Sequence, residues 1–313
     1  KRHVYLAMKG LEEAQAIFSR VWREKETSPE EIDVEDSLGR VTSEPVFAKI
    51  SAPTYHSAAM DGIAVRAEET YGATEKTPKI LKIGGEALWI DTGKALPEGY
   101  NAVVMVEKIY QLDEEHVEIL SPAHPWQNIR KVGEDIVATQ LLLPQNHVIR
   151  PYDMGALITA GVFKIMVRRK PGVIIIPTGT ELIHRKDVMD PGHLGKNQII
   201  ESNSVILSGL VREAHGKPTV FDITPDNETD IRDALLRAID SDPDLVIINA
   251  GSSAGSKDYT ADIIGEIGEI LVHGVAMMPG KPTILGTVNG KPVIGIPGYA
   301  VSAIMSFEQF AKP

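Results

Sequence analysis

The sequence predicts an α/β fold with a mostly parallel sheet in the C-terminal half and an elongated β-rich region before it. After Pro171, apolar runs alternate with amphipathic segments, which is typical of parallel strands covered by helices. From Ser28 to about Leu143, short apolar runs are broken by Pro and Gly instead. With 313 residues, 43% of them hydrophobic, the chain is long enough for about two domains.

The first element predicted is an amphipathic helix within residues 6–24, where apolar side chains recur at helical spacing. Residues 27–144 are predicted to form the β-rich domain, with strands that include Ile80–Ile83, Ala102–Val106 and Val117–Leu120. Residues 151–170 return to a helical pattern. We therefore group residues 1–26 and 145–170 as a helical or linker domain, and interpret the basic run Arg168-Arg169-Lys170 as a solvated helix end.

The third predicted domain is residues 171–313, where strand and helix patterns alternate. The elements expected, in order, are Val173–Ile176, Val205–Ala214, Thr219–Ile223, Asp230–Ile239, Leu245–Asn249 and Tyr259–Ile267. Thr283–Thr287 and Val293–Ile296 flank Asn289-Gly290, which favours a hairpin turn. A final helix is expected from Ala300 to Phe310.

Composition excludes several classes of function. The formal net charge of -11 argues against nucleic-acid binding, because that affinity depends on a basic face. The absence of cysteine excludes disulfides, thiolate nucleophiles and cysteine metal ligands. No segment approaches the roughly 20 apolar residues of a membrane span, and Lys1–Glu26 lacks a signal-peptide core. These features predict a cytoplasmic protein with no membrane partner.

Two loops with unusual sequence follow predicted strands, where ligands bind in open parallel sheets. Thr178-Gly179 and Glu181 follow the strand at 173–176, and a simple turn is the alternative interpretation. Ser202-Asn203 precede a helix, where their side chains and backbone N–H groups are suited to an anion. Capping of the helix is the alternative.

Two further loops add small residues and a lysine. The segment 249–258 holds Gly251, Ser252, Ser253 and Gly255 before Asp258 and a helix start, so a phosphate can approach its backbone closely. A flexible connector is the alternative interpretation. Two Pro-Gly turns follow neighbouring strands. One contains Gly280-Lys281 and the other is Pro297-Gly298, and Lys281 is the candidate phosphate ligand.

Other motif matches fail on context. Gly274 to Lys281 is one residue too long for a phosphate-binding P-loop and continues to Pro282. Gly251 to Gly255 fits G-x-S-x-G, which leaves a serine hydrolase at Ser253 as a remote alternative with only His273 downstream. The nine histidines show no zinc-ligand spacing.

In this order the loops resemble the MoeA/gephyrin E-domain family of molybdopterin molybdenumtransferases. The upstream motifs agree, and with the four loops they cover nearly the whole chain: Ala58-Ala59-Met60-Asp61-Gly62-Ile63-Ala64, Thr92-Gly93, Leu96 to Val104 with Glu107, and Arg130 with Gly133-Glu134-Asp135-Ile136.

The resemblance implies a MogA-like α/β domain at residues 171–313 and an elongated homodimer. It also implies an enzyme of molybdenum or tungsten cofactor biosynthesis, which inserts molybdate or tungstate into adenylylated molybdopterin with magnesium-dependent release of AMP. A transient contact with a molybdopterin adenylyltransferase is a further expected partnership. Family members usually carry another C-terminal β domain, which this chain is expected to lack because it stops at Pro313.

The resemblance and the chemistry together assign roles to the candidate residues. Glu181, Asp226 and Asp258 are expected to hold Mg²⁺, with Glu181 and Asp258 catalytic. Arg130 and Asp61 are expected to form an oxyanion pocket. The other expected substrate-binding residues are Thr178, Gly179, Ser202, Asn203, Gly251, Ser252, Ser253, Gly255, Gly280, Lys281, Pro297 and Gly298.

Several positions depart from the family pattern, namely His56, Ala58, Thr180, Met278 and Tyr299-Ala300. They leave the choice between molybdate and tungstate open. They also leave a second interpretation, a non-catalytic molybdopterin-binding sensor or scaffold. Ala58, in place of a common Ser, favours the scaffold. Glu181 and Asp258 beside Lys281 favour the enzyme, because pterin binding alone does not require two carboxylates near a phosphate.

Overall fold

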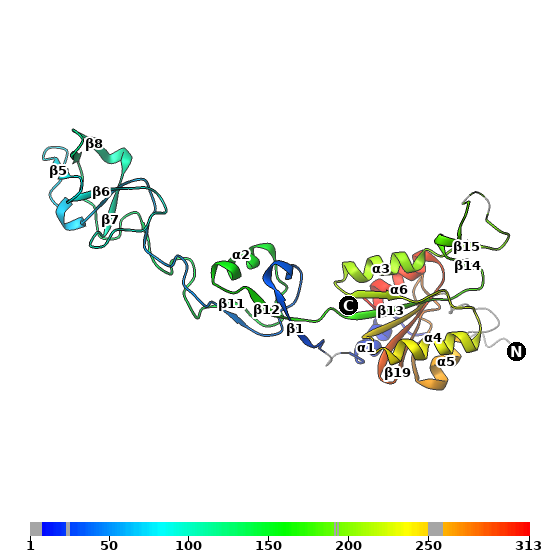
Figure 1. The fold of residues 1–313 in the computed structure, drawn as a ribbon. Helices are drawn as coiled ribbons and strands as arrows, with labels where there is room; N and C mark the ends of the chain where they lie inside the picture. The colour runs from blue at the N-terminus through cyan, green and yellow to red at the C-terminus, as the bar shows by residue number, and fades with distance from the viewer. Residues whose placement is uncertain (1–7, 23–25, 191, 193, 250–258) are drawn as a thin grey trace. The chain divides into compact units, whose positions relative to one another are not determined.

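The computed structural model describes residues 8–22, 26–190, 192, 194–249 and 259–313. The chain divides into two compact units, an α/β unit of residues 1–29 and 168–313 and a β-rich unit of residues 30–167. Figure 1 shows both ribbons. The chain therefore crosses between the units twice, near Pro29 and near Arg168.

The α/β unit is built on a six-stranded sheet with the order β16-β13-β17-β20-β19-β18. The first four of these strands run parallel, and β19 and β18 add antiparallel pairings. The strands are β13 (Gly172–Pro177), β16 (Lys217–Val220), β17 (Leu245–Asn249), β18 (Glu269–His273), β19 (Ile284–Val288) and β20 (Lys291–Ile296). A separate parallel pair is formed by β14 (Leu182–Ile183) and β15 (Ile199–Ile200).

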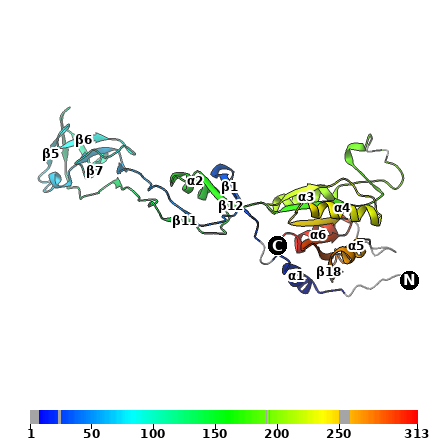
Figure 2. The ribbon, with the colours of Figure 1, turned by 60° about the horizontal axis from the view of Figure 1, so that its bottom comes forward.

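Helices cover both faces of this sheet, as its uninterrupted apolar strands predict (Figures 1 and 2). One face packs against α1 (Leu11–Ser19), α3 (Asn203–Glu213) and α6 (Ala300–Phe310). The other packs against α4 (Glu228–Asp240) and α5 (Tyr259–Ile267). Successive residues of the central strands β13, β17 and β20 alternate between the two cores, so their side chains are largely removed from water, while the edge strand β16 is mostly exposed.

The turn between β19 and β20 follows the predicted hairpin chemistry. Asn289 and Gly290 have φ values of 50° and 71°, the left-handed pair that a two-residue hairpin turn requires. Val288 and Lys291 close the turn as Cα partners. The antiparallel strand β18 was not among the sequence predictions.

Helix α1 belongs to the α/β unit, which differs from the sequence grouping of residues 1–26 with 145–170. Ala14 and Phe18 are buried in the core that α3, α6 and the sheet form. Residues 151–159 instead lie in the β-rich unit. The apolar stripe of α1 predicts a buried face, but the pattern alone does not say which core buries it.

The β-rich unit contains two three-stranded antiparallel sheets, β6-β4-β7 and β5-β9-β8. They enclose a core that includes Ile63, Leu81, Val104 and Ile119. The strands of the unit are β1 (Pro29–Asp33), β2 (Val46–Phe47), β3 (Ser57–Ala58), β4 (Gly62–Val65), β5 (Lys79–Lys82), β6 (Ala87–Ile90), β7 (Ala102–Met105), β8 (Ile109–Gln111), β9 (His116–Ile119), β10 (Ile129–Arg130), β11 (Leu141–Leu143) and β12 (Lys164–Arg168), where β12 ends in the other unit.

The predicted helix at 151–170 is wrong beyond its first half. Helix α2 spans Pro151–Thr159, and the chain then turns at Gly161, which has a φ of 76°, and continues as strand β12. Ile165 and Val167 point into a core with α2. The β-branched Ile165 and Val167 favour a strand and alternate with less buried residues, and the turn at Gly161 separates them from the helix.

The basic run Arg168-Arg169-Lys170 is also not a solvated helix end. Arg169 donates to both carboxylate oxygens of Asp244, at 2.7 and 2.9 Å, and Arg168 pairs with Glu26. Burial raises the pKa of Asp244, but hydrogen bonds from Arg169 and the Gly172 N–H outweigh that effect and leave the pKa below its ordinary value. Through these ion pairs, the residues that precede β13 are held against Asp244 and Glu26 of the same unit.

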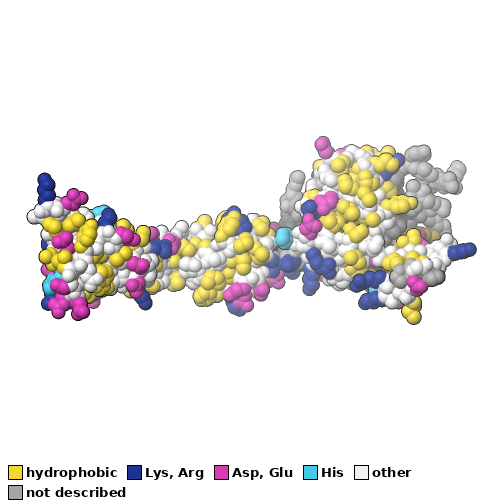
Figure 3. Space-filling model, turned by 90° about the horizontal axis from the view of Figure 1, so that it is seen from above, with side chains coloured by type: hydrophobic (Ala, Val, Ile, Leu, Met, Phe, Trp, Pro, Cys, Tyr) yellow, Lys and Arg dark blue, Asp and Glu magenta, His cyan; other side chains and the backbone are white. Residues whose placement is uncertain are grey.

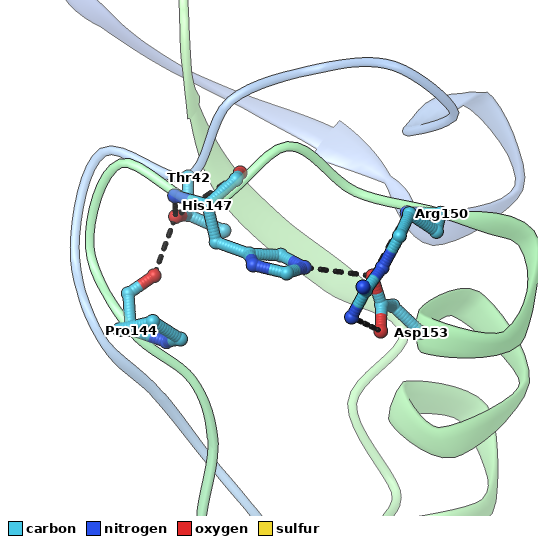
Figure 4. A network of polar contacts seen from close by, with 5 residues as sticks. All are labelled: Thr42, Pro144, His147, Arg150 and Asp153. Atoms are coloured by element: carbon cyan, nitrogen blue, oxygen red, sulfur yellow. Dashed lines mark hydrogen bonds and ion pairs between the residues drawn. The ribbon is translucent and has the colours of Figure 1, made fainter.

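A buried carboxylate organises the start of α2 (Figure 4). Asp153 is 7% exposed and accepts hydrogen bonds from the Arg150 N–H at 2.9 Å and the Arg150 Nε at 3.0 Å. The His147 Nε2 lies 2.7 Å from the same carboxylate, and the His147 N–H donates to Thr42 Oγ1 at 2.9 Å. The network ties the 144–147 turn to the helix and to the residue 42 segment.

Substitution Asp153→Asn is expected to destabilise the β-rich unit by about 2 kcal/mol, because buried donors lose a charged acceptor. The Arg150 hydrogen bonds hold the pKa of Asp153 well below its ordinary value of 3.8, against the effect of burial. The carboxylate therefore stabilises the unit fully above that value, and this contribution is lost as the pH falls below it. Urea unfolding of both proteins from neutral to acid pH should show the difference shrinking only at the acid end. A difference independent of pH would contradict this assignment.

The face seen in Figure 3 mixes hydrophobic, acidic and basic side chains over both units, with no continuous basic surface. Among the residues described, no helix is both long enough and apolar enough to cross a bilayer.

Candidate functional site

The carboxyl ends of three parallel strands coincide. Pro177, the last residue of β13, pairs with Asn249, the last residue of β17, and Asn249 pairs with Ile296 at the end of β20. The loops that follow these strands therefore leave the sheet from one edge. This edge is where the sequence predicted a ligand site.

A pair of asparagines connects two of these strand ends with helix α3. Asn249 is 1% exposed, and its Nδ2 donates to the Pro297 carbonyl at 3.3 Å. The Asn203 Nδ2 donates to Asn249 Oδ1 at 3.0 Å and to the Gly298 carbonyl at 2.7 Å. The predicted residues Asn203, Pro297 and Gly298 are thus brought together. Asn249 was missed as a site residue, although a polar residue closing an all-apolar strand is a usable signal.

A cavity of about 540 Å³ opens beside this asparagine pair. Its polar lining includes Glu181, Glu201, Ser202, Asn203 and Asn249, and its other side chains are largely apolar. Apolar walls with a few convergent polar groups are the usual composition of a small-molecule site. Glu181 is exposed to this space, and no described residue forms an ion pair with it.

The 178–181 turn directs Glu181 to the cavity. The Thr178 N–H donates to the Asn249 carbonyl at 2.9 Å, and the Gly179 N–H donates to the Thr224 carbonyl at 3.1 Å. A Cβ on Gly179, whose φ is 153°, would lie 2.9 Å from a Glu181 carboxylate oxygen. Glycine is therefore needed for the chain to fold back so tightly.

Helix α3 begins differently from the prediction that its N-terminus is open to an anion. Ser202 is the N-cap residue, but its side chain makes no capping hydrogen bond. Glu201, which is buried, accepts from the Ser204 N–H at 2.8 Å and from the Ser204 hydroxyl. A protein carboxylate thus already occupies part of the helix N-terminus, where negative charge is favourable.

The loop containing Gly280 and Lys281 lies over helix α6. Gly280 has a φ of 110°, and its carbonyl accepts from Thr283 Oγ1 at 2.6 Å, while Thr283 Oγ1 lies 2.7 Å from Ser306 Oγ. These contacts fix the backbone of the turn. Lys281 itself is exposed and is not among the residues that line the cavity, although its neighbour Pro282 is.

The remaining predicted residues of this unit are placed only in part. Asp226 is exposed in the loop between β16 and α4, and Thr224 in that loop bridges to Thr178. Gly251, Ser252, Ser253, Gly255 and Asp258 lie outside the described residues, so neither the third loop nor the serine hydrolase alternative at Ser253 is tested by the geometry. Within the part of the chain that is described, no three acidic or histidine side chains cluster as a metal site.

In the β-rich unit, Asp61 is held by a threonine that belongs to the next motif. Asp61 Oδ1 accepts from the Thr92 N–H at 2.7 Å and from the Thr92 hydroxyl at 2.8 Å. These two hydrogen bonds lower the pKa of Asp61. A Cβ on the following Gly62 would lie 1.9 Å from the Val104 carbonyl oxygen, so the Asp61-Gly62 pair is fixed against β7.

Arg130 lies near this segment but is already paired. Strand β10 places Arg130 opposite Ser57, four residues from Asp61 in the chain. The Arg130 guanidinium hydrogen-bonds to Asp135, and its Nε lies 3.8 Å from Glu134. Asp135 and, less strongly, Glu134 raise the pKa of Arg130. An oxyanion at Arg130 must therefore compete with these carboxylates, and the expected oxyanion pocket of Arg130 and Asp61 stays a prediction.

Comparisons with known proteins agree across nearly the whole chain. A family model described as "MoeA N-terminal region (domain I and II)" matches residues 9–161, and "Probable molybdopterin binding domain" matches residues 174–313. A Methanocaldococcus jannaschii protein named for molybdopterin biosynthesis is 37% identical over 90% of this chain and 73% of its own length. The chain belongs to the MoeA family.

Other MoeA relatives extend this likeness. Molybdopterin molybdenumtransferase 2 of Mycobacterium tuberculosis is 32% identical over 98% of this chain and 78% of its own length. The crystal structure of a molybdopterin biosynthesis MoeA protein from Pyrococcus horikosii aligns with a TM-score of 0.80 at 33% identity, covering 97% of this chain and 78% of that one. The MoeA resemblance expected from the ordered motifs is thereby confirmed.

Substitution Asn203→Ala is expected to lower the free energy of unfolding of the α/β unit by about 1–3 kcal/mol, because the buried Asn249 Oδ1 and the exposed Gly298 carbonyl lose their donor. The matched control is Ser202→Ala, the adjacent exposed residue without a capping bond, which should change stability by less than about 0.5 kcal/mol. Urea unfolding measures both. Equal effects of the two substitutions would show that the Asn203 amide does not hold the strand ends together.

Substitution Thr92→Val removes the side-chain donor to Asp61 and should raise the pKa of Asp61 toward its ordinary value. A pH titration of the carboxyl carbon signals by NMR measures this change. Asp113, whose lowered pKa depends on Glu115 and His116, serves as the internal control and should not move. An unchanged Asp61 pKa would show that the hydroxyl does not set its charge.

Proposed function

We propose that this protein inserts molybdate or tungstate into adenylylated molybdopterin and releases AMP. The observation that carries the proposal is the cavity at the strand ends, where Glu181 faces a space bounded by the Asn203 and Asn249 amides. The name of the M. tuberculosis relative, a molybdopterin molybdenumtransferase, supports the same reaction. The MogA-like character of the α/β unit, the homodimer, the adenylyltransferase contact and the cytoplasmic location implied by the family resemblance belong to this proposal.

In the proposed reaction, water cleaves the phosphoanhydride that joins AMP to molybdopterin, and the oxyanion loses oxide as water when its metal binds the two dithiolene sulfurs. The cavity supplies what the phosphate-bearing part needs. The Ser202 hydroxyl at the start of α3 makes no capping hydrogen bond and is the donor offered to a phosphate, while Asn203 positions the neighbouring loop and the 178–179 turn holds Glu181 against the same space. The nearby Gly280-Lys281 turn is rigid, so Lys281 extends from a fixed backbone as the phosphate-binding cation of the proposal.

The proposed ligands Glu181, Asp226 and Asp258 are all carboxylates, the type of ligand that Mg²⁺ prefers beside its water and phosphate ligands. Glu181 lines the cavity, and Asp226 is exposed on a loop that bridges to the 178 turn. Asp258 would complete the set. Bound there, the ion would neutralise charge on the leaving phosphate. Glu181 and Asp226 would hold the ion, and the ion would attract the phosphoanhydride that the carboxylates alone would repel.

The proposed oxyanion end lies in the β-rich unit. The hydrogen bonds from Thr92 lower the pKa of Asp61 and so favour its charged form, which in turn favours a hydrogen-bonding or cationic neighbour. Arg130 supplies the positive charge, which Asp135 and Glu134 partly neutralise. An oxyanion that displaces these carboxylates gains a guanidinium whose planar donors match its oxygens.

The decisive experiment follows AMP release from adenylylated molybdopterin with Mg²⁺, with added molybdate, added tungstate or neither. The proposal expects release that depends on an oxyanion, and the more effective oxyanion identifies the metal used. Tight binding of the pterin without release in all three conditions would sink the transferase and leave the sensor or scaffold.

Substitution Glu181→Gln is expected to slow oxyanion-stimulated AMP release by roughly a hundredfold, because an amide cannot replace a charged metal ligand. The effect should fall on kcat at saturating Mg²⁺. Glu213→Gln, an exposed carboxylate at the other end of α3, is the matched control and should keep the wild-type rate. A wild-type rate in Glu181→Gln would remove this residue from the proposed site.

A further inference from the structure

We propose that Tyr299 is a specificity-determining residue that stacks on the flat bicyclic ring of a phosphorylated ligand in the strand-end cavity. Tyr299 lines this cavity and is 84% exposed. Its hydroxyl makes no hydrogen bond with any described residue. The proposal rests on the proposed function, since it concerns the adenine or the pterin of the same substrate.

The backbone that carries Tyr299 is fixed although its side chain is not. The preceding carbonyl, that of Gly298, accepts the Asn203 amide at 2.7 Å. The Tyr299 carbonyl in turn accepts the Ala303 N–H at 2.9 Å, as the first hydrogen bond of α6. A ring anchored in this way loses little backbone freedom when it binds a ligand.

The surroundings of Tyr299 suit a flat ring. Its chain neighbours are Gly298 and Ala300, both small, so neither covers its faces. Other parts of the cavity wall are aliphatic, with Leu182 and Ile199 paired across strands β14 and β15. An aromatic face together with aliphatic walls favours a planar heteroaromatic group over a sugar or a phosphate.

The polar groups of the cavity lie between these apolar parts. Strand β15 leads directly into Ser202 and Asn203, and Asn203 in turn holds Gly298, next to Tyr299. A ring resting on Tyr299 therefore shares its cavity with the Ser202 hydroxyl, the asparagine pair and Glu181. Purine and pterin rings both combine a stacking face with a hydrogen-bonding edge, so both match this arrangement.

The test is isothermal titration of the full chain with two probes, AMP and 6-hydroxymethylpterin phosphate. Tyr299→Ala is expected to weaken binding of the stacked probe about tenfold, and Tyr299→Phe should bind within about twofold of wild type, because stacking needs the ring and not the hydroxyl. The probe that responds identifies the ring that stacks. Val301→Ala is the matched control, since Val301 is 63% exposed on the same helix and does not line the cavity.

Equal affinity of Tyr299→Ala and wild type for both probes would overturn the inference, and so would failure of wild type to bind either probe at millimolar concentration. AMP release by wild type is measured separately. If release fails while Tyr299-dependent binding persists, the proposed function falls and the stacking residue stands. If release occurs and Tyr299→Ala binds both probes normally, only the stacking residue falls. Thermal unfolding confirms that each variant is folded.

Discussion

The register of three parallel strands is the constraint on which the rest of the α/β unit depends. Pro177, Asn249 and Ile296 end their strands side by side, so the loops beyond them start from one edge. A one-residue slip would exchange the side chains of the two cores, because successive strand residues face opposite helices. Burial on both faces therefore fixes the positions of the site residues as well as the fold.

Hydrogen bonds fix the turns that follow the buried strands. The buried Asn249 amide, together with Asn203, holds the Pro297-Gly298 turn, and a buried amide tolerates no unpaired donor. Glu201 satisfies the first turn of α3 in the same region. The cavity thus has a rigid polar side, which is what recognition of one ligand geometry requires. Its aliphatic side comes from the separate β14 and β15 pair.

The two units distribute charge in different ways. In the α/β unit, Glu181 is exposed to the cavity without an ion-pair partner among the described residues. In the β-rich unit, Asp61 and Arg130 are both engaged, by Thr92 and by Asp135. A carboxylate left without a cation suits metal binding. A guanidinium in a half-exposed ion pair remains accessible, but an anionic ligand must compete with its carboxylates.

The sequence by itself determined the α/β pattern after Pro171, the hairpin at Asn289-Gly290 and the ordered motifs of the family, because these depend on local periodicity, turn chemistry and residue identity. Only the tertiary structure decided where α1 packs, that residues 164–168 form a strand, and that Arg169 pairs with Asp244. It also decided that Asn249 contributes to the site and that the Arg130 guanidinium is hydrogen-bonded to Asp135. Such contacts join residues far apart in the chain or choose among several local partners, and a linear pattern does not encode that choice.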